Sequence, residues 1–427
     1  MKSLASFLGG SAKTSFSLLL IHSNLIIYSM AFWIQNPVLP QKLKNLNASE
    51  VEVGSLQSIG AILALLGSTV VGRIVDVYGA KTGLLLSQMS SAVMYFIISQ
   101  ASTMNDMYIA TVPSFFQHAM LCASASVALL TTTDQRHLAL GRLGLSYGVG
   151  MSIGSPLGGA ISKHFSPEVS FQVATLACVI MITIDLLFLP PLLAEKTEEV
   201  DDQSKESSEK NKFEFGTLIT VITDYTSVRN LLIISLPTGL GTSAFRSMFS
   251  LAAIDEFQLD SQNLGFLMSF NALLGLVTNV FLLAWFAKMF GDKITVTISL
   301  FVQSFCFLAI FLVPHEPMNF ILISIPQAIA TTIFYTLSSS MLTKVVANEK
   351  QGTVVSLSHA SRSLTQVLAP VLGGLVMRNF KFAGVGLFAA SLTTFGGILS
   401  VFILKEQSDY EHNTNNIHSK EEKTRID

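Results

Sequence analysis

Twelve long apolar runs, arranged as two sets of six around one charged stretch, most constrain how this 427-residue chain can fold. A helix needs about 20 consecutive apolar residues to cross the hydrocarbon core of a bilayer. Helices and closed barrels are the architectures that satisfy all backbone polar groups inside lipid. The sequence therefore predicts an all-α membrane protein with twelve transmembrane helices in two six-helix bundles.

The composition agrees with a membrane protein and excludes other classes. Charged residues make up 13% of the chain, whereas soluble domains carry about 25%. There is no basic stripe of the kind that nucleic-acid binding requires. Cys122, Cys178 and Cys306 all lie inside apolar runs, so we expect buried thiols rather than disulfides or metal ligands. No nucleotide motif or metal-ligand spacing occurs, and we expect no enzyme activity, cofactor or metal.

The apolar runs also predict the domain boundaries. The expected spans are 15–37, 53–74, 82–101, 106–130, 138–161, 168–191, 230–253, 263–287, 294–313, 318–343, 353–377 and 382–404. The organisation is therefore a cytosolic N-terminus (1–14), an N-terminal bundle (15–192), a charged cytosolic linker (193–229), a C-terminal bundle (230–405) and a disordered cytosolic tail (406–427).

The basic residues predict the orientation, because cytosolic loops of membrane proteins are enriched in Lys and Arg. With both termini in the cytosol, nineteen of the 26 Lys and Arg residues fall in cytosolic segments and five in outer loops. The glycosylation sequon at Asn47 then lies on the first outer loop.

Two segments of the chain repeat. Residues 72–81 follow the second span and residues 284–293 follow the eighth, and both contain a Gly and a Lys at the same relative positions. A second repeat relates Gly158-Gly159 in the fifth span to Gly373-Gly374 in the eleventh. Two six-helix halves related in this way are typical of one large class of transporters.

The first loop has the pattern G-x-x-x-D-x-x-G-x-K, formed by Gly72, Asp76, Gly79 and Lys81. This pattern resembles the signature between the second and third helices of the major facilitator superfamily. The resemblance implies that the loop, with Arg73 beside Asp76, latches the two halves together on the cytosolic side. A carboxylate there can accept hydrogen bonds from a helix N-terminus. The alternative is an ordinary interfacial loop.

The fifth span resembles the glycine-rich motif of drug–proton antiporters in that superfamily, with Gly141, Gly150, Gly154 and Gly158 in place and Pro156 one position late. Residues 139–150 are similar to the organic-cation-transporter-like solute carriers. Small residues at this spacing allow helices to approach closely, and we expect the eighth span as partner, through Gly265 and Gly275. Pro156 should bend the helix. The alternative is dense packing without a role in motion.

Polar groups inside spans are costly and mark candidate sites. Arg362 in the eleventh span is the strongest candidate for contacting a solute. Arg246 in the seventh is a second, unless it extends outward to Asp255 or Glu256. Further hydrogen-bonding candidates are Gln117, His118, Asn271, Tyr335 and Gln366. His118, whose pKa lies near physiological pH when unperturbed, and Asp185 in the sixth span are the candidates for carrying a coupling proton.

The leading hypothesis is a secondary active transporter of a small organic solute that works by alternating access. The resemblance implies proton-coupled antiport of organic cations or drugs. The spans that the resemblance places around the cavity have no carboxylate at mid-depth but contain Arg, so an anion or zwitterion carrier or a passive facilitator stays open. A non-transporting scaffold or transceptor that uses the charged linker is the other alternative. We expect a monomer in the plasma membrane or in an endosomal or lysosomal membrane, whose partners are lipid, the solute and protons.

Overall fold

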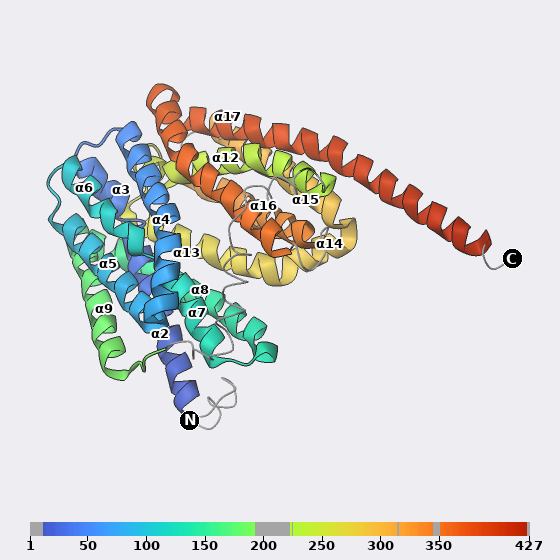
Figure 1. Cartoon of the computed structure of the whole chain (residues 1–427). Coiled ribbons are helices and arrows are strands. Elements are labelled where there is room, and N and C mark those ends of the chain that lie inside the picture. Colours follow the sequence, from blue (N-terminus) through green and yellow to red (C-terminus); the bar gives the residue numbers. More distant parts are fainter. Residues whose placement is uncertain (1–11, 193–222, 224, 314–315, 345–350, 425–427) are drawn as a thin grey trace.

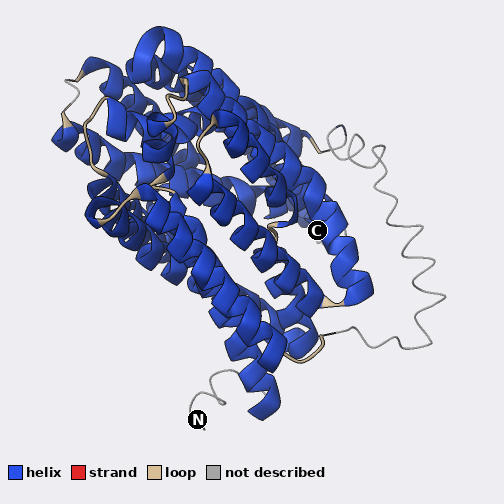
Figure 2. Cartoon of the chain, turned by 90° about the vertical axis from the view of Figure 1, so that its left-hand side faces the viewer, coloured by secondary structure: helices blue, strands red, loops and turns tan. Residues whose placement is uncertain are grey.

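The computed structural model describes residues 12–192, 223, 225–313, 316–344 and 351–424, and their regular elements are helices joined by short loops (Figure 2). The N-terminal half contains α2 (Ala12–Gln35), α3 (Leu39–Asn45), α4 (Glu50–Tyr78), α5 (Ala80–Gln100), α6 (Met104–Thr111), the 3₁₀ helix η1 (Val112–Phe116), α7 (Ala119–Leu130), α8 (Thr133–His164) and α9 (Pro167–Phe188). The C-terminal half contains α12 (Thr226–Asp255), α13 (Ser261–Val277), the π-helix η2 (Thr278–Leu282), α14 (Leu283–Phe290), α15 (Asp292–Leu312), α16 (Pro317–Lys344) and α17 (Gln351–Thr424).

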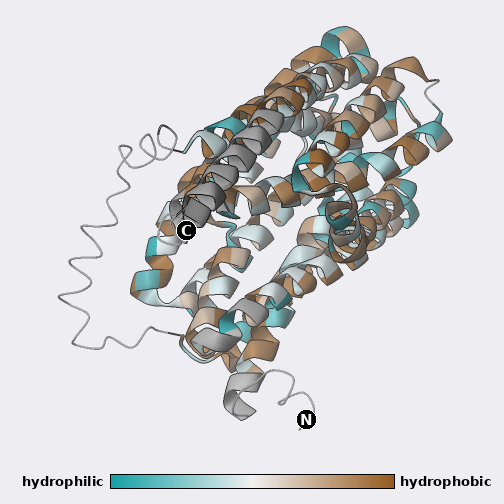
Figure 3. Cartoon of the chain, turned by 90° about the vertical axis from the view of Figure 1, so that its right-hand side faces the viewer, coloured by the Kyte–Doolittle hydropathy of each residue, from teal (hydrophilic) through white to brown (hydrophobic). Residues whose placement is uncertain are grey.

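The predicted spans lie largely on helix, and the fourth is interrupted at Gln117 and His118. Within the described residues, 9 stretches are long and apolar enough to cross a membrane. The last of these, Ser356–Ile403, holds the two final predicted spans, because α17 changes direction at Lys381, where φ is 60°. The predicted all-α membrane fold is confirmed, and Figure 3 shows apolar residues along the outer helices. Large apolar side chains such as Phe305 and Phe402 are exposed, where lipid would cover them.

Two boundaries differ from the prediction. α12 begins at Thr226, inside the predicted linker, of which residues 193–222 lie outside the described residues. α17 continues to Thr424, through most of the segment for which the sequence predicts disorder. That segment contains no Gly or Pro, and extending an existing helix costs much less than starting one.

The internal repeat is visible in the backbone. Gly79 ends α4 with φ 88° and ψ 159°, and Gly291 ends α14 with φ 78° and ψ 160°. An L side chain rarely adopts this conformation, so both sites need glycine. Gly72 differs, because it lies inside α4 and a Cβ there would meet no atom within 4 Å. Of the two loop glycines, Gly79 alone is required by the turn.

We call the two ends of the molecule the Asn47 end, with loops 46–49, 165–166 and 256–260, and the Asp76 end, with the turns at Gly79 and Gly291. At the Asn47 end the two halves touch, and from there they diverge toward the Asp76 end (Figure 1). Two ion pairs join the halves at the Asn47 end, Lys44–Asp255 at 2.7 Å and Lys163–Asp260 at 2.8 Å. Burial raises the pKa of Asp260, but the Lys163 ammonium outweighs this and holds the pKa below its usual range.

Two glycines bring α4 and α17 into backbone contact near the Asn47 end. A Cβ at Gly54 would lie 2.2 Å from the carbonyl oxygen of Pro370, and one at Gly374 would lie 2.4 Å from that of Glu50. Real Cβ atoms do not approach a backbone oxygen so closely. Neither position can therefore carry a side chain while this contact is closed.

The contact between α8 and α13 repeats the same arrangement. A Cβ at Gly159 would lie 2.2 Å from the carbonyl oxygen of Ser261, and one at Gly265 would lie 2.3 Å from that of Ser155. Toward the Asp76 end of α8, by contrast, a Cβ at Gly144 would meet nothing within 4 Å. The structure is therefore closed between the halves at the Asn47 end and open at the Asp76 end.

The prediction that the glycine-rich motif of the fifth span packs against the eighth span is wrong for three of its glycines. A Cβ at Gly150, Gly154 or Gly158 would collide with the backbone of α2, within the same half, at 2.3, 2.4 and 2.1 Å. The residues of α8 that face α13 are Gly148, Ser152, Ser155 and Gly159. Small residues on two adjacent faces of one helix give similar spacings in the sequence, so the spacing alone did not identify the partner.

Pro156 has a specific consequence at this interface. Proline lacks an N–H, so the carbonyl of Ser152 four residues earlier has no helical donor. The Ser269 hydroxyl of α13 donates to that carbonyl at 2.8 Å, and it thereby joins the two halves. The proline thus supplies an acceptor for a hydrogen bond between halves.

We expect Ser269→Ala to weaken closure at the Asn47 end by about 0.5–1.5 kcal/mol, the net value of one such hydrogen bond. Spin labels on exposed Phe165 and Asn379 would report closure as a short interlabel distance, and its population should fall in the variant. The control is Ser124→Ala on α7, which removes a bond within one helix. An equal fall in both variants would contradict the assignment.

Candidate functional site

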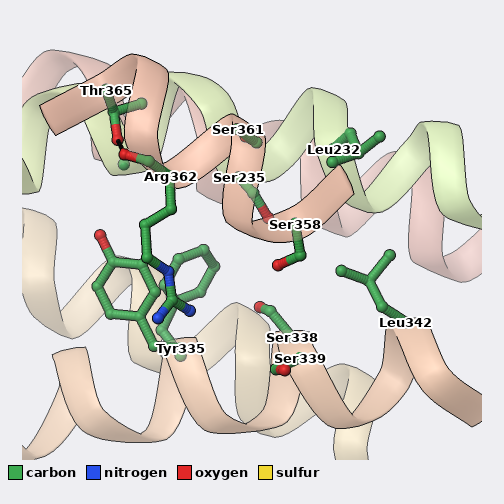
Figure 4. A pocket seen from close by; sticks show the side chains of 12 residues that line it. Leu232, Ser235, Tyr335, Ser338, Ser339, Leu342, Ser358, Ser361, Arg362 and Thr365 are labelled. Atoms are coloured by element: carbon green, nitrogen blue, oxygen red, sulfur yellow. Dashed lines mark hydrogen bonds between the residues drawn. The ribbon is translucent and has the colours of Figure 1, made fainter. Parts of the chain in front are cut away.

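A pocket lies inside the C-terminal half, between α12, α16 and α17 (Figure 4). Its lining consists of Leu232, Ser235, Gly239, Phe334, Tyr335, Ser338, Ser339, Leu342, Ser358, Ser361, Arg362 and Thr365. Most of these side chains carry a hydroxyl group, and none is acidic. The pocket therefore combines one cation with many small hydrogen-bonding groups.

Arg362 is the charged group of this pocket. Its guanidinium carbon lies 4.7 Å from the centroid of the Tyr335 ring, a cation–π distance. Tyr335 lies between the two helices that supply the other pocket residues, with Ser243 of α12 on its far side. Among the described residues no carboxylate forms an ion pair with Arg362. Its N–H donors therefore remain available to a ligand.

The hydroxyl groups come from two facing helices. Ser358, Ser361 and Thr365 follow one another along α17 at helical spacing, and Ser338 and Ser339 face them from α16 (Figure 4). The Ser338 hydroxyl is buried and has no hydrogen-bond partner among the described residues. A buried hydroxyl without a partner is costly, which indicates that a ligand or water completes the site.

The other predicted residues of the C-terminal half lie around this pocket rather than in it. Arg246 is exposed on α12 and close enough to Tyr147 and Tyr335 to act on both electrostatically. It does not extend to Asp255 or Glu256, because Asp255 pairs with Lys44 and Glu256 accepts from the backbone of Phe382. Gln366 is exposed on α17, one turn beyond Arg362, and Asn271 is half-buried on α13.

Gln117 and His118 lie in the N-terminal half, at a break in the fourth span between η1 and α7. The Gln117 side chain donates to the sulfur of Met94 at 3.1 Å, whereas Nε2 of the His118 ring is buried and has no hydrogen-bond partner among the described residues. Met94 lies on α5, so the Gln117 contact stays inside the N-terminal half. The structure does not bring them to the pocket.

Backbone groups freed by this break have partners on neighbouring helices. The Ser87 hydroxyl donates to the Phe116 carbonyl at 3.0 Å and accepts from the His118 N–H, and the Tyr28 hydroxyl donates to the Gln117 carbonyl at 3.2 Å. Non-helical backbone in a membrane span requires such partners. Continuous hydropathy over 106–130 concealed the break, and Pro113 is the one local signal for it.

The loop motif is divided in two. Arg73 and Asp76 are exposed at the Asp76 end, and no described residue forms an ion pair with them. Lys81 instead donates to the carbonyls of Leu186 and Leu189 at the end of α9, at 3.4 and 2.5 Å. The latch therefore stays a prediction, for a conformation in which the halves meet at this end.

Sequence reasoning identified Arg362 and Tyr335 but missed the serine and threonine hydroxyls. A signal was present, because positions 358, 361 and 365 share one helix face with Arg362. Small hydroxyl residues are also common packing residues in membrane helices. Here Ser338 and Ser339, which face these hydroxyls from α16, indicate a binding site rather than helix packing. Within the described residues, no cluster of His, Cys, Asp and Glu side chains could hold a metal ion.

Comparison with known proteins places this fold in a family. The model of the Major Facilitator Superfamily matches residues 21–229 and 231–425. Human solute carrier family 67 member A1 is 26% identical over 367 residues, which cover 85% of this chain and 86% of that protein. Mouse solute carrier family 22 member 18 is 28% identical and covers 83% and 87%, and multidrug resistance protein 1 of Bacillus subtilis is 23% identical and covers 85% and 90%.

Solved structures show the same fold. A bacterial homolog of the human lysosomal transporter Spinster, in an inward-facing and occupied conformation, matches with a TM-score of 0.73 at 13% identity and covers 94% of this chain and 98% of that chain. The human organic anion transporter MFSD10 (TETRAN) matches with a TM-score of 0.60 at 16% identity, covering 92% and 100%. The resemblance predicted from the sequence is thereby confirmed: the chain belongs to the Major Facilitator Superfamily and is a membrane transporter, not an enzyme.

Proposed function

We propose that this protein carries a small organic solute with an anionic group, a carboxylate, phosphate or sulfate, which binds Arg362 in the pocket of the C-terminal half. The proposal rests on the Arg362 guanidinium, which forms no ion pair with any described residue. Hydrogen bonds between an ionised donor and an ionised acceptor are roughly twice as strong as neutral ones. The surrounding hydroxyls can satisfy the remaining oxygens, and Phe334 and Tyr335 offer apolar surface to the organic part. An amine, whether in a cation or a zwitterion, would have to lie outside the pocket.

The proposed orientation follows from the basic loops, with the Asp76 end and both termini in the cytosol. The present conformation then opens to the cytosol, and transport requires the halves to separate at the Asn47 end and close at the Asp76 end. In that closed form, Asp76 would meet the opposite half as a latch. Asn47, exposed in a turn at the outer end, stays the predicted glycosylation site.

A panel of labelled solutes in proteoliposomes tests the function. We expect uptake of organic anions or zwitterions and little uptake of organic cations. Each solute is measured once with and once without a pH gradient across the membrane. Uptake that depends on the gradient would support proton coupling. Uptake of cations alone would favour the drug–proton antiport that several relatives suggest and would contradict the anion pocket. Failure to move any member of the panel would favour the scaffold alternative.

A further inference from the structure

A buried polar cluster in the N-terminal half lies apart from the solute pocket. It consists of Asn24 on α2, Gln88 on α5 and Asp185 on α9, and each is 0% exposed. Gln88 donates its amide to the Asn24 side-chain oxygen at 3.1 Å, and Asn24 donates its own amide to Oδ2 of Asp185. The amide groups thus form a chain that ends on the carboxyl group.

The chain leaves two acceptors without donors. Oδ1 of Asp185 and Oε1 of Gln88 are both buried and have no hydrogen-bond partner among the described residues. An ionised carboxylate with a single donor is very costly in such a place. One proton on Oδ1 removes the charge and converts that acceptor into a donor.

The charged and titratable groups around Asp185 do not compensate a carboxylate. Lys81 on α5 acts on it electrostatically, but the Lys81 ammonium is held by the carbonyls of Leu186 and Leu189. Other titratable groups on the helices packed against α9 include Tyr28 and His22 on α2, Tyr95 on α5, Tyr147 and Arg142 on α8, and Cys178 on α9 itself. Lys42 on α3 pairs with Glu168 at the far end of α9.

Lys81 also connects this cluster to the loop at the Asp76 end. Beside it, the Ala80 N–H donates to the carbonyl of Leu192 at 2.9 Å, so the turn at Gly79 and the end of α9 are held together. Asp185 directly precedes Leu186 and lies one turn before Leu189, the two residues whose carbonyls bind Lys81. If Asp185 ionises, its carboxylate becomes a stronger partner for the Lys81 ammonium than the α9 carbonyls. The carboxylate then competes with the contacts that hold the turn at Gly79.

We propose that Asp185 binds a proton in the conformation open at the Asp76 end, and that losing the proton draws Lys81 from the α9 carbonyls to the carboxylate and releases the Gly79 turn. The proton passes between water and Oδ1, and no other bond changes. The proposal does not depend on the solute or on Arg362, because the cluster lies wholly within the other half. It assigns the coupling ion of a carrier to α9, which does not line the solute pocket.

Infrared titration of the purified protein in lipid nanodiscs tests it without any solute. We expect the C=O band of a buried carboxylic acid near neutral pH and its complete loss in Asp185→Asn. The control, Asp76→Asn, changes an exposed carboxylate at the end of α4 and should keep the band. Absence of the band in the wild-type protein at neutral and mildly acidic pH, or its persistence in Asp185→Asn, would overturn the proposal.

Two further variants test the cluster if Asp185→Asn does not fold. Asn24→Leu removes the donor to Oδ2, and Lys81→Gln removes the competing cation. Both should make the carboxylate less stable, so the acid band should persist to more alkaline pH. Unchanged titration in both variants would refute the proposed switch. Titration that changes when Na⁺ replaces K⁺ would show a metal cation at the site and would likewise refute a proton.

Discussion

Replacing Arg362 by Ala is expected to reduce uptake of an anionic solute by on the order of 10- to 100-fold, because a hydrogen bond to a charged group contributes about 1.5–3 kcal/mol and each 1.4 kcal/mol is a factor of ten. The loss should appear mainly as weaker binding of the solute. The side chain forms no ion pair with the described residues, so its removal should leave the amount of folded protein in the membrane unchanged. Proteoliposome uptake over a range of solute concentrations measures the effect.

Two variants make the result specific. Arg362→Lys keeps the charge but loses the planar pair of donors, so uptake should recover only in part. Arg246→Ala removes a cation that is exposed on α12 and does not line the pocket, and its effect should be smaller. Unchanged uptake in Arg362→Ala, or an equal loss in Arg246→Ala, would show that the pocket is not the binding site.

Adding one methyl group at Gly159 is expected to shift the whole protein away from the present conformation. Its Cβ would lie 2.2 Å from a backbone oxygen of α13, which cannot rotate away as a side chain would. Overpacking of this kind costs about 1–3 kcal/mol, and this changes a two-state equilibrium by on the order of 5- to 150-fold. We expect Gly159→Ala to open the Asn47 end and slow transport.

The same helix supplies a matched control. Gly144→Ala adds the same methyl group where it meets nothing within 4 Å, and Ala favours the helix. The spin labels at Phe165 and Asn379 should report a longer distance in Gly159→Ala and an unchanged one in Gly144→Ala. If Gly374→Ala on α17 gives the same opening, the two glycine contacts act together. Unaltered distances in Gly159→Ala would contradict the proposed closure.

The architecture could be predicted because each apolar run is long enough to span the membrane. In lipid such a run satisfies its backbone hydrogen bonds as a helix. The turn at Gly79 could be recognised from its motif and its repeat at Gly291. Arg362 could be chosen as a candidate as well, since a charge in a span is costly wherever it lies, and the structure places it in the lining of a pocket. These inferences depend on residue type and on position along the chain, both of which the sequence contains.

Other features depend on which helix faces which, and there the sequence was insufficient. Gly158 and Gly159 are adjacent, yet one contacts α2 and the other α13. Pro156 suggested a bend, but its observed effect is to leave a carbonyl for Ser269. The burial of Asp185 against Asn24 joins residues 161 positions apart. Such pairings follow from packing in three dimensions and have no local signature.

If the Arg362 pocket binds the solute as proposed, its confinement to a single half should limit which molecules the protein can carry. A pocket made by α12, α16 and α17 alone would move as one body with that half, so an anionic group held there should be bound equally well in both conformations. A ligand that binds two conformations with equal affinity does not change the equilibrium between them. Selection among solutes should therefore depend on the part that protrudes toward the opposite half. Short fragments would occupy the pocket without triggering movement, and overly long ones would hold the protein open as inhibitors.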